Sequence, residues 1–582
     1  MRLFKAFPLC LILCLALFTS SVYCNYQWEE GEDHFSSSES CLEPPQEHHE
    51  QPMQFKDPVM ANLIMKELDI FEPYYNRRPR FTWPYQYIGY FLGMKIDNEY
   101  CDKHRNYFAH NPGYVFNMSN YVSSYIPQHF ARVYALDVIA TNAQPKIQYW
   151  GNANRSKVYD VPLNTSLYVT GSTAFYKRHV MKQFSCLGQM SNHIPGHDSL
   201  YQKDKSALAL AKYKQEYKTR PECLAPNKYF PKNYLMSDQI QCLEFFKVLN
   251  SERYKQLQQE RNVVFIRKVV GKHAGAGITP VNKTVEEAIR KTYQDGARCG
   301  LEGKVVLMQQ FIHNPMLIHN RKSDFRLYML VASTNPLIAF YHDGYFRISS
   351  TEYDPRSSEK SSLVTNSAIS PQLRTARKTG FFEGKTYAEL KEDQSWLFGR
   401  LQKYLLDEGM ITDPDWVENH LRPEAKKAMI HLLRSAQHGF LKRSSVFELY
   451  GVDFMLDDQL NLWFIEANAL PGLSEKTPTL TKFEGKMLRD EFDIIFRLLR
   501  SRMKRIFNYV NKVIMSGEAR MISHDKVEIQ DLEAHIQEFR QISSNRFEPE
   551  FEPLPDNGFF KIIDENYSGT KRYSDILSDE CL

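Results

Sequence analysis

The feature that most constrains this chain is a pair of strongly apolar strand patterns separated by a short turn. The runs Glu448–Leu456 and Leu462–Ala467 are rich in aromatic and branched residues, and Asp457-Asp458 between them is a turn signal. Such a pattern predicts a two-stranded antiparallel ribbon that is largely buried. A buried ribbon accepts charged side chains only where another group compensates their charge.

Three polar residues interrupt this ribbon. In the predicted pairing Asp453 lies opposite the region of Glu466, and Glu466 and Asn468, two residues apart, point to the same face. Two carboxylates and an amide oxygen are hard ligands that suit Mg²⁺ and the phosphates it carries. We predict a magnesium site of Asp453, Glu466 and Asn468; the alternative is a surface hairpin whose acids face water.

A second pattern is an apolar strand that ends on a lysine and is followed by a glycine-containing loop. The strand reaches Lys268, and Gly271, Gly275 and Gly277 follow it. Glycines let backbone N–H groups approach phosphate oxygens, while the lysine neutralises charge. The segment matches neither the Walker loop nor the dinucleotide-binding glycine motif, and a plain hairpin turn explains it equally well.

A third pattern alternates charge along one strand. Lys322, Asp324 and Arg326 share a face of their strand, and Arg347 lies in a neighbouring one. Taken alone, this pattern slightly favours a cross-strand salt-bridge ladder on an exposed sheet over a ligand site.

The remaining apolar spacing predicts a mixture of short strands and amphipathic helices. Further strands are expected at Tyr87–Leu92, Arg132–Ile139, Ser166–Val169 and Val305–Met308, and helices at Ser206–Tyr217, Asp238–Asn250, Val285–Tyr293, Leu421–Leu441 and Phe483–Val513. Three consecutive antiparallel strands are expected at Phe325–Ala332, Leu337–Tyr341 and Tyr345–Ile348, with Asp343-Gly344 as the turn between the last two. The fold class is therefore α/β (α+β) with antiparallel sheets.

Together the patterns follow the order of an ATP-grasp nucleotide site, and the chain resembles the tubulin–tyrosine-ligase-like amino-acid ligases over about residues 189–473. Besides the three patterns above, the matching words are Ser191–Gly196, Lys203-Asp204, Phe230–Tyr234, Gln309–Ile312, Asp343–Arg347, Val364–Asn366 and Phe447–Leu473. The resemblance implies an ATP-grasp-type nucleotide fold preceded by a smaller N-terminal domain.

Carried over residue by residue, the resemblance implies three sets of site residues. Those that would bind ATP at its phosphates, ribose and base are Lys268, Gly275, Gly277, Gln309, Gln310, Phe311, Ile312, Lys322, Asp324, Thr365 and Asn366. Those that would act on the reacting groups are Arg326, Arg347 and Glu466. Those that would bind Mg²⁺ are Asp453, Glu466 and Asn468.

The implied reaction activates a carboxylate by phosphoryl transfer from ATP, and the amine of a free amino acid then attacks the acyl phosphate. The products are an amide or isopeptide bond, ADP and phosphate. The stretch 325–366 looks most like the polyglycylase branch, so the expected donor is glycine or glutamate. The expected partner is an acidic acceptor protein such as a tubulin tail, and the expected state is a monomer.

Three departures from the family pattern keep a rival interpretation open. Val269 replaces the proline usual after the strand lysine, Ala274 replaces a basic or amide residue, and Ser361-Ser362 stands where the family has a histidine. The rival is a non-catalytic relative that binds ATP or microtubules. A ligase that joins free small molecules is a further alternative.

Composition, charge and the family resemblance together divide the chain into six regions, of which the two ATP-grasp domains are implied by the resemblance. These are 1–24, a signal peptide; 25–59, a disordered acidic and His-rich linker; 60–229, an N-terminal domain; 230–320, the central ATP-grasp domain; 321–515, the C-terminal catalytic domain; and 516–582, a loosely ordered polar tail. A net charge of +4 on 582 residues gives no reason to expect nucleic-acid binding. A basic helix at 483–513 is one surface for an acidic acceptor, although a solvated helix face explains it more simply.

The N-terminus conflicts with a cytosolic substrate. Arg2 and Lys5 precede the apolar run Pro8–Phe18, which is typical of a signal peptide and too short for a stable membrane anchor. We therefore expect the secretory pathway or secretion; the resemblance favours cytoplasm, cytoskeleton or cilium. Seven cysteines lie outside the leader without a CxxC pair, which is compatible with one or two disulfides or with free buried thiols.

Overall fold

The computed structural model describes five short strands between residues 114 and 169 and most of the chain from 190 to 566. Gaps of three or more residues within the second part are 217–225, 273–276, 360–362, 366–383, 443–445, 474–476 and 539–552. The predicted signal peptide, the linker and the predicted strand Tyr87–Leu92 lie outside the described residues.

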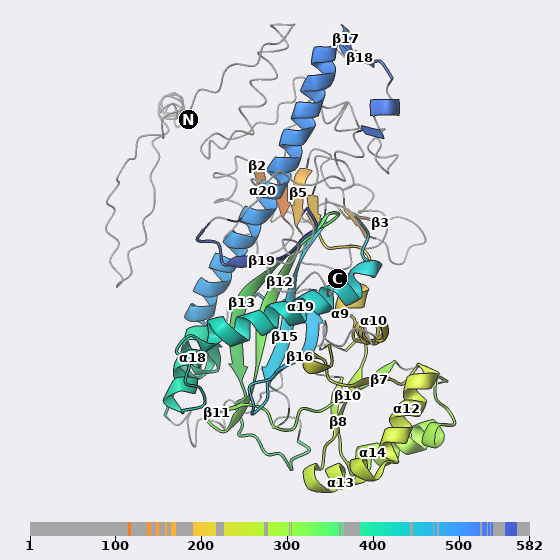
Figure 1. Cartoon of the computed structure of the whole chain (residues 1–582), viewed down its shortest axis with the longest axis vertical. Coiled ribbons are helices and arrows are strands. Elements are labelled where there is room, and N and C mark those ends of the chain that lie inside the picture. Colours follow the sequence, from red (N-terminus) through yellow and green to blue (C-terminus); the bar gives the residue numbers. More distant parts are fainter. Residues whose placement is uncertain are drawn as a thin grey trace, which may run out of the picture. The chain divides into compact units, whose positions relative to one another are not determined.

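The central element of the described chain is an eleven-stranded mixed sheet (Figure 1). Its strands run in the order β14-β13-β12-β15-β6-β5-β1-β2, and β11, β16 and β19 pair with β12, β15 and β13. The bounds are β1 Tyr114–Asn117, β2 Asp137–Ala140, β5 Thr165–Val169, β6 Met190–Asn192, β11 Leu317–Ile318, β12 Arg321–Thr334, β13 Leu337–Ile348, β14 Ser395–Leu397, β15 Val446–Leu456, β16 Leu462–Asn468 and β19 Phe559–Asp564. The pairs from β14 to β15 are antiparallel, and those from β15 to β2 are parallel. The predicted mixed class is confirmed.

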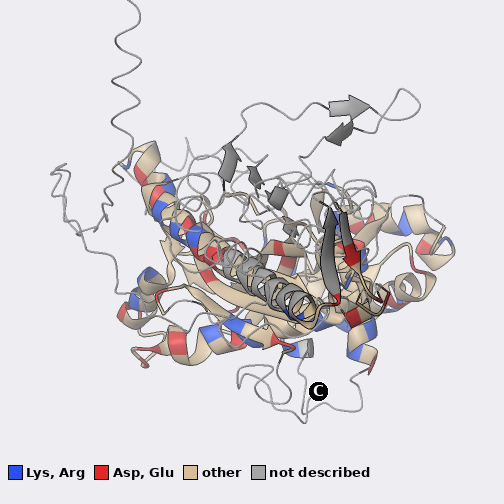
Figure 2. Cartoon of the chain, turned by 90° about the horizontal axis from the view of Figure 1, so that it is seen from above, with Lys and Arg blue, Asp and Glu red and all other residues tan. Residues whose placement is uncertain are grey.

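Strands β12 and β15 are buried along their whole length because helices cover both faces. On one face α18 (Phe398–Asp407) and α19 (Arg422–Ala436) share a hydrophobic core with the sheet. On the other face Phe483 and Phe492 of α20 (Pro478–Ser516) pack against Tyr328 and Phe447. Burial on both sides explains the nearly unbroken apolar runs of these strands. Charged residues mark mainly the helices around the sheet (Figure 2).

The predicted turn at Asp343-Gly344 is wrong. Strand β13 runs through both residues without a break, and the connection from β12 to β13 is at Asn335-Pro336. The register shifts between Arg326 and Tyr328, and a side chain at position 344 would overlap the Arg326 carbonyl. Gly344 is therefore required for a close approach of two strands at a bulge.

A second, four-stranded antiparallel sheet has the order β7-β10-β8-β9. Its strands are β7 Asn233–Leu235, β8 Phe265–Val269, β9 Ile278–Val281 and β10 Val306–Gln310, and its helices are α12 Gln239–Leu249, α13 Glu252–Arg261 and α14 Lys283–Tyr293. The three helices lie beside this sheet (Figure 1), and the helices and the sheet share a separate aromatic core. Within that core Cys242 and Cys299 form a disulfide, so one of the two cysteine alternatives holds for this pair.

The other described α-helices and strands lie outside the two larger sheets. They are α9 Asp198–Tyr201, α10 Lys203–Glu216, α11 Pro226–Tyr229, α17 Tyr387–Asp393, and the hairpins β3 Ile147–Tyr149 with β4 Lys157–Tyr159 and β17 Ala519–Ser523 with β18 Lys526–Ile529. The predicted helices are found as α10, α12, α14, α19 and α20, with ends within five residues of those expected. Strand β19, which joins the large sheet, shows that the polar tail is not loose throughout. Among the described helices, none is both long enough and apolar enough to cross a membrane.

Candidate active site

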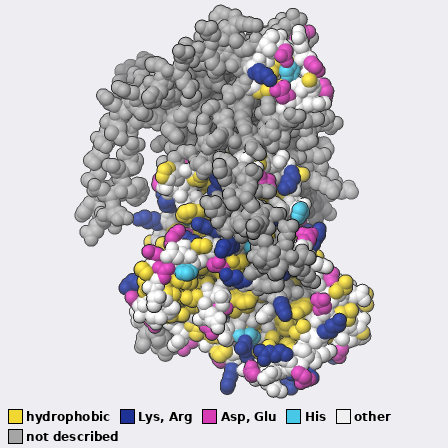
Figure 3. Space-filling model, in the orientation of Figure 1, with side chains coloured by type: hydrophobic (Ala, Val, Ile, Leu, Met, Phe, Trp, Pro, Cys, Tyr) yellow, Lys and Arg dark blue, Asp and Glu magenta, His cyan; other side chains and the backbone are white. Residues whose placement is uncertain are grey.

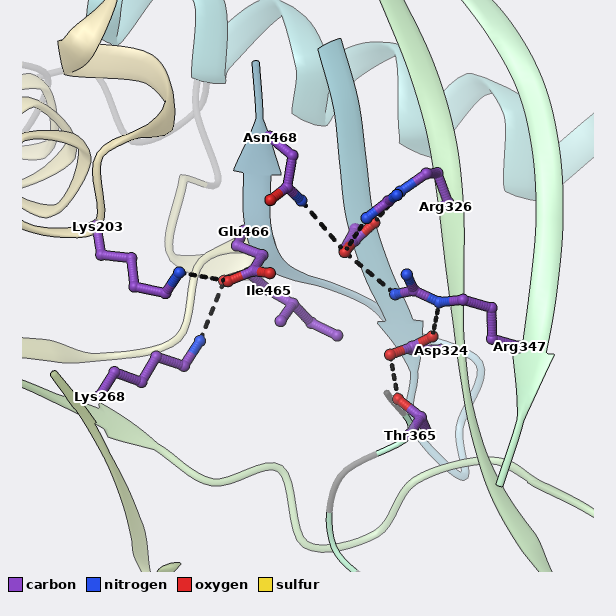
Figure 4. A network of polar contacts seen from close by, with 10 residues as sticks. Lys203, Lys268, Asp324, Arg326, Arg347, Thr365, Ile465, Glu466 and Asn468 are labelled. Atoms are coloured by element: carbon purple, nitrogen blue, oxygen red, sulfur yellow. Dashed lines mark hydrogen bonds and ion pairs between the residues drawn. The ribbon is translucent and has the colours of Figure 1, made fainter. Parts of the chain in front are cut away.

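Strand register gathers the predicted charged residues on one face of the large sheet (Figure 4). Arg326 of β12 lies directly opposite Asp453 of β15, which lies directly opposite Glu466 of β16. Asp324 of β12 lies directly opposite Arg347 of β13. Side chains at paired positions share a face of the sheet, so five groups predicted from separate patterns lie together.

Asp453 is the centre of this cluster. Its Oδ1 accepts a hydrogen bond from Arg326 Nε at 2.8 Å and its Oδ2 one from Arg326 Nη2 at 2.9 Å, while Arg347 Nη2 is 3.1 Å from Oδ2. Asn468 Nδ2 lies 3.5 Å from the same oxygen. Burial alone would raise the pKa of Asp453, but the two arginines hold it below its ordinary value. Asp453 is therefore an ionised, buried carboxylate.

Asp324 connects Arg347 of β13 with Thr365. Arg347 Nε donates to Asp324 Oδ1 at 2.6 Å, and the Thr365 hydroxyl donates to the other oxygen. The pairing is the cross-strand ladder that the sequence favoured for this strand. The sequence placed this ladder on an exposed sheet, but Asp324 is only 6% exposed. The observed ladder is therefore buried.

Glu466 faces the second sheet through two lysines. Lys203 Nζ lies 3.0 Å from Glu466 Oε2, and Lys268 Nζ donates to the Ile465 carbonyl at 3.5 Å. Lys203, Lys268, Glu466 and Gln309 line one small pocket. Burial lowers the pKa of Lys268 to about 8, although the nearby carboxylate of Glu466 acts in the opposite direction. This buried cation is suited to an anionic ligand.

Lys203 was not assigned a role from the sequence. It begins α10, and the chain before it is fixed by Glu448, whose Oε1 lies 2.9 Å from His193 Nδ1 and whose Oε2 accepts from the Ile194 N–H at 3.1 Å. The word Lys203-Asp204 was part of the family resemblance, which is the one signal that pointed to it. No local periodicity places this helix beside Glu466.

The predicted adenine segment lies at the end of β10. Phe311 packs in a small apolar cluster with Val263 and Ile266, and Lys322 Nζ lies 4.5 Å from the centre of the Phe311 ring. Lys322 also donates to the Leu363 carbonyl at 2.9 Å, and burial lowers its pKa to about 8. Gln310 and Ile312, which belong to the same predicted segment, are both half-buried. The side-chain oxygen of Gln310 accepts a hydrogen bond from the Lys232 N–H at 3.4 Å.

The glycine loop closes a hairpin, as one of the two sequence interpretations had it. Strands β8 and β9 pair up to Lys268 and Ile278, and the Val269 N–H then donates to the Gly277 carbonyl at 2.9 Å. A Cβ at Gly277 would crowd the Val269 carbonyl and the Lys272 side chain. The predicted site residues Gly275 and Asn366 lie outside the described residues.

The charge balance of the cluster tests whether ATP and Mg²⁺ fit it. Five basic side chains stand against three acidic ones; they are Lys203, Lys268, Lys322, Arg326 and Arg347 against Asp324, Asp453 and Glu466. An excess of buried positive charge suits a polyphosphate. The described residues contain no group of three or more His, Cys, Asp and Glu side chains that would hold a metal alone. Two opposed carboxylates with one amide are instead the kind of set that binds Mg²⁺ together with phosphates and water.

A mixed sheet with this basic-acidic face, next to a second antiparallel sheet that carries a lysine and a glycine loop, is an architecture consistent with the ATP-grasp fold class. The chain belongs to the tubulin-tyrosine ligase family, whose model matches residues 180–506. The predicted resemblance is thereby confirmed.

Curated relatives carry glycylase names. The chain is 29% identical over 210 residues to "Protein polyglycylase TTLL10" of Macaca fascicularis, which covers 35% of this chain and 32% of that protein. It is also 29% identical over 210 residues to "Inactive polyglycylase TTLL10" of Homo sapiens, over 35% and 29% of the two chains. With "Tubulin glycylase 3C" of Tetrahymena thermophila it shares 31% over 236 residues, 40% and 20% of the two chains. The matched segment thus spans a third or less of these relatives.

Proposed function

We propose that this chain is an ATP- and Mg²⁺-dependent ligase that joins an amino acid, glycine or glutamate, to side-chain carboxylates of an acidic acceptor protein. The observation that carries this proposal is the row Arg326–Asp453–Glu466 across three neighbouring strands. It puts an arginine and two carboxylates at fixed spacing beside buried lysines. This arrangement suits the transfer of a phosphoryl group between two anionic partners.

Asp453, Glu466 and Asn468 would hold the metal in this proposal. Bound there, Mg²⁺ would neutralise charge on the ATP phosphates. Asp453 is oriented for this role because Arg326 and Arg347 fix both of its oxygens. Glu466 is the more accessible ligand, with 26% of its side chain exposed.

The basic residues would bind and orient the reactants. Lys268 and Lys203 face the pocket beside Glu466 and would pair with phosphate oxygens, and Lys322 beside Phe311 would lie at the base and ribose. Arg326 and Arg347 would stabilise charge on the transferred phosphoryl group and on the acyl phosphate. Catalysis would come from positioning and charge stabilisation, since the proposed reaction needs no covalent enzyme nucleophile.

The donor and acceptor are proposed from the relatives. Glycine is the favoured donor because the named relatives are glycylases, and glutamate is the second choice. Tubulin is the favoured acceptor because "Tubulin glycylase 3C" is among them. On the face drawn in Figure 3, basic and acidic side chains of the described part are interspersed. On this face an acidic tail would therefore be recognised by local basic groups.

The compartment is proposed separately. The leader-like N-terminus favours entry into the secretory pathway, and the Cys242–Cys299 disulfide supports it because such bonds persist in oxidising compartments. In that compartment the acceptor would be another acidic polypeptide. Cytoplasm or cilium, with tubulin as acceptor, is the alternative that the relatives' names support.

A second candidate function is nucleotide binding without catalysis. It is favoured by one specific observation, the name "Inactive polyglycylase TTLL10" of the human relative. The departures at Val269 and Ala274 would be its cause in this chain. The two candidates differ in turnover and not in ATP binding.

The test is mass spectrometry of acidic acceptor peptides after incubation with the chain, ATP, Mg²⁺ and one amino acid at a time. Mass addition with glycine alone supports a glycylase, and addition with glutamate or tyrosine names another donor. ATP binding without ADP release in the presence of every donor and acceptor would show the non-catalytic function. Release of a free dipeptide without peptide modification would show a small-molecule ligase.

A further inference from the structure

Tyr345 stands at the edge of the candidate site and has no role in the function proposed above. It lies on β13 directly opposite Arg326. It therefore extends the row through Asp453 to Glu466 across four neighbouring strands. Arg347 follows two residues later on β13 and faces the same way. Tyr345 is thus adjacent to both arginines of the site.

The Tyr345 hydroxyl is buried and has no hydrogen-bond partner in the part of the chain that the structure describes. The residue is 1% exposed. Two other buried tyrosines of the same sheet are paired: Tyr341 Oη donates to Asp343 Oδ1 at 2.7 Å, and Tyr328 Oη donates to Glu484 Oε1 at 3.5 Å. Buried hydroxyls without a partner are rare because the missing bond costs free energy. Tyr345 therefore calls for a partner outside the protein or for a cost that function offsets.

The charged groups that act on this hydroxyl are Arg326, Arg347 and Asp453 of the candidate site and Glu484 of α20. Burial raises the pKa of Tyr345, and Arg326 and Arg347 are the next strongest influences on it. Tyr345 in turn acts on the pKa of both arginines. The phenol oxygen consequently shares one space with the two guanidinium groups. With its pKa above the ordinary value, the phenol keeps its proton at neutral pH and is a hydrogen-bond donor.

We propose that Tyr345 is a further catalytic residue, whose hydroxyl donates a hydrogen bond to an oxygen of the phosphoryl group that Arg326 and Arg347 hold. This inference rests on the proposed function. The proton stays on Tyr345 throughout, so the step needs no further reactant. A neutral donor stabilises charge that develops on the oxygen without adding a third positive charge beside the arginines.

The variant Tyr345→Phe tests this role because it removes the hydroxyl and keeps the ring. The expected result is a kcat for amino-acid-dependent ADP release lower by on the order of 10²-fold, with little change in KM for ATP. The melting temperature should be unchanged or higher, since an unpaired buried hydroxyl disappears. A variant that is less active yet no less stable is not expected from a packing defect.

Tyr341→Phe is the matched control. Tyr341 is fully buried on the same strand, and its hydroxyl is paired with Asp343. Its loss should lower the melting temperature and leave kcat unchanged. The two substitutions are chemically identical, so opposite outcomes separate a catalytic hydroxyl from a structural one.

Wild-type kcat in Tyr345→Phe, together with a raised melting temperature, would overturn the inference and leave the hydroxyl as an uncompensated structural group. If the unmodified chain shows no turnover with any donor and acceptor, the proposed function fails on its own. The role of Tyr345 is then decided by binding of ADP, Mg²⁺ and aluminium fluoride, a mimic of the phosphoryl group. The inference is supported if ADP and Mg²⁺ stabilise Tyr345→Phe as much as the unmodified chain while aluminium fluoride adds less stabilisation to the variant. It is contradicted if aluminium fluoride adds the same stabilisation to both proteins.

Discussion

Glu466→Gln is the substitution that separates chemistry from stability most cleanly at this site. The change keeps the shape of the side chain and removes one charge. Among the described residues Glu466 makes one ion pair, with Lys203 at 3.0 Å, and the two side chains are 26% and 22% exposed. Pairs of this kind contribute about 0–1 kcal/mol. We therefore expect the melting temperature to fall by no more than about 4 °C.

The expected effect on activity is much larger. If Glu466 holds Mg²⁺ against the ATP phosphates, a neutral amide weakens the charge stabilisation that the metal supplies, a contribution of several kcal/mol. A loss of about 3 kcal/mol already lowers the rate by more than about 10²-fold. Mass addition to acceptor peptides should then fall below detection. The measurement pairs that mass assay with a thermal melt of the same preparation.

Asp453→Asn is the contrast within the same metal site. It leaves Arg326 and Arg347 without their shared buried carboxylate, and breaking a buried pair costs about 3–5 kcal/mol. Loss of activity in that variant would be ambiguous because the fold is weakened as well.

Near-normal mass addition by Glu466→Gln would refute the metal-site assignment. A collapse of its melting temperature would refute the claim that Glu466 contributes little to stability.

Further predictions concern the buried lysines, the disulfide and Gly344. Burial lowers the pKa of Lys268 and Lys322 to about 8. Because both lysines lose their charge above that pH, the affinity of the chain for ATP and Mg²⁺ should fall as the pH rises through 8. Calorimetric titration on either side of pH 8 measures this change. The free protein should become more stable between pH 8 and 10.5, the ordinary lysine value, because the unfolded chain binds protons there that the folded chain does not. Cys242→Ala should cost about 2–4 kcal/mol, since the bond closes a loop with a sequence separation of 57. Urea unfolding checks it, and reductant should remove the difference in stability between the unmodified chain and the variant. Gly344→Ala should destabilise by about 3 kcal/mol through overlap with the neighbouring backbone, whereas Gly399→Ala, in open space on a helix, should be neutral or stabilising by thermal melt.

The sequence predicted which side chains of the β15–β16 ribbon lie together because that signal is local. The ribbon that carries Asp453 and Glu466 turns within a few residues, so alternation and turn position fix which side chains share a face. The same reasoning placed Asp324 and Arg326 on one face of β12. It did not show that the arginines also hold Asp453, because that contact depends on which strand lies beside β12.

Two other features were beyond the sequence for related reasons. Lys203 reaches Glu466 only because β6 pairs with β15 and the buried Glu448 anchors the chain before α10, and no local pattern encodes that contact. The Asp343-Gly344 turn was predicted from a dipeptide that is common in hairpins. In the structure Gly344 instead lies where β13 approaches β12 closely at a bulge. Both situations require a glycine, so the dipeptide alone cannot tell a turn from a close approach of two strands.

The site divides into a part built on the large sheet and a part built on the glycine loop, and this division bears on whether the chain is active. Asp453, Glu466 and Arg326 are spaced by strand pairing, so changes elsewhere leave their geometry intact. The loop departs from the family pattern at Val269, and here the Val269 N–H donates to the Gly277 carbonyl at 2.9 Å. The proline usual at this position has no N–H and cannot make that bond. This chain therefore extends its hairpin by one bond past Lys268, which restrains the backbone that would approach the phosphates. An inactive form of this site would consequently retain the row of Arg326, Asp453 and Glu466 and would differ at the end of β8, where Lys268 and Val269 lie.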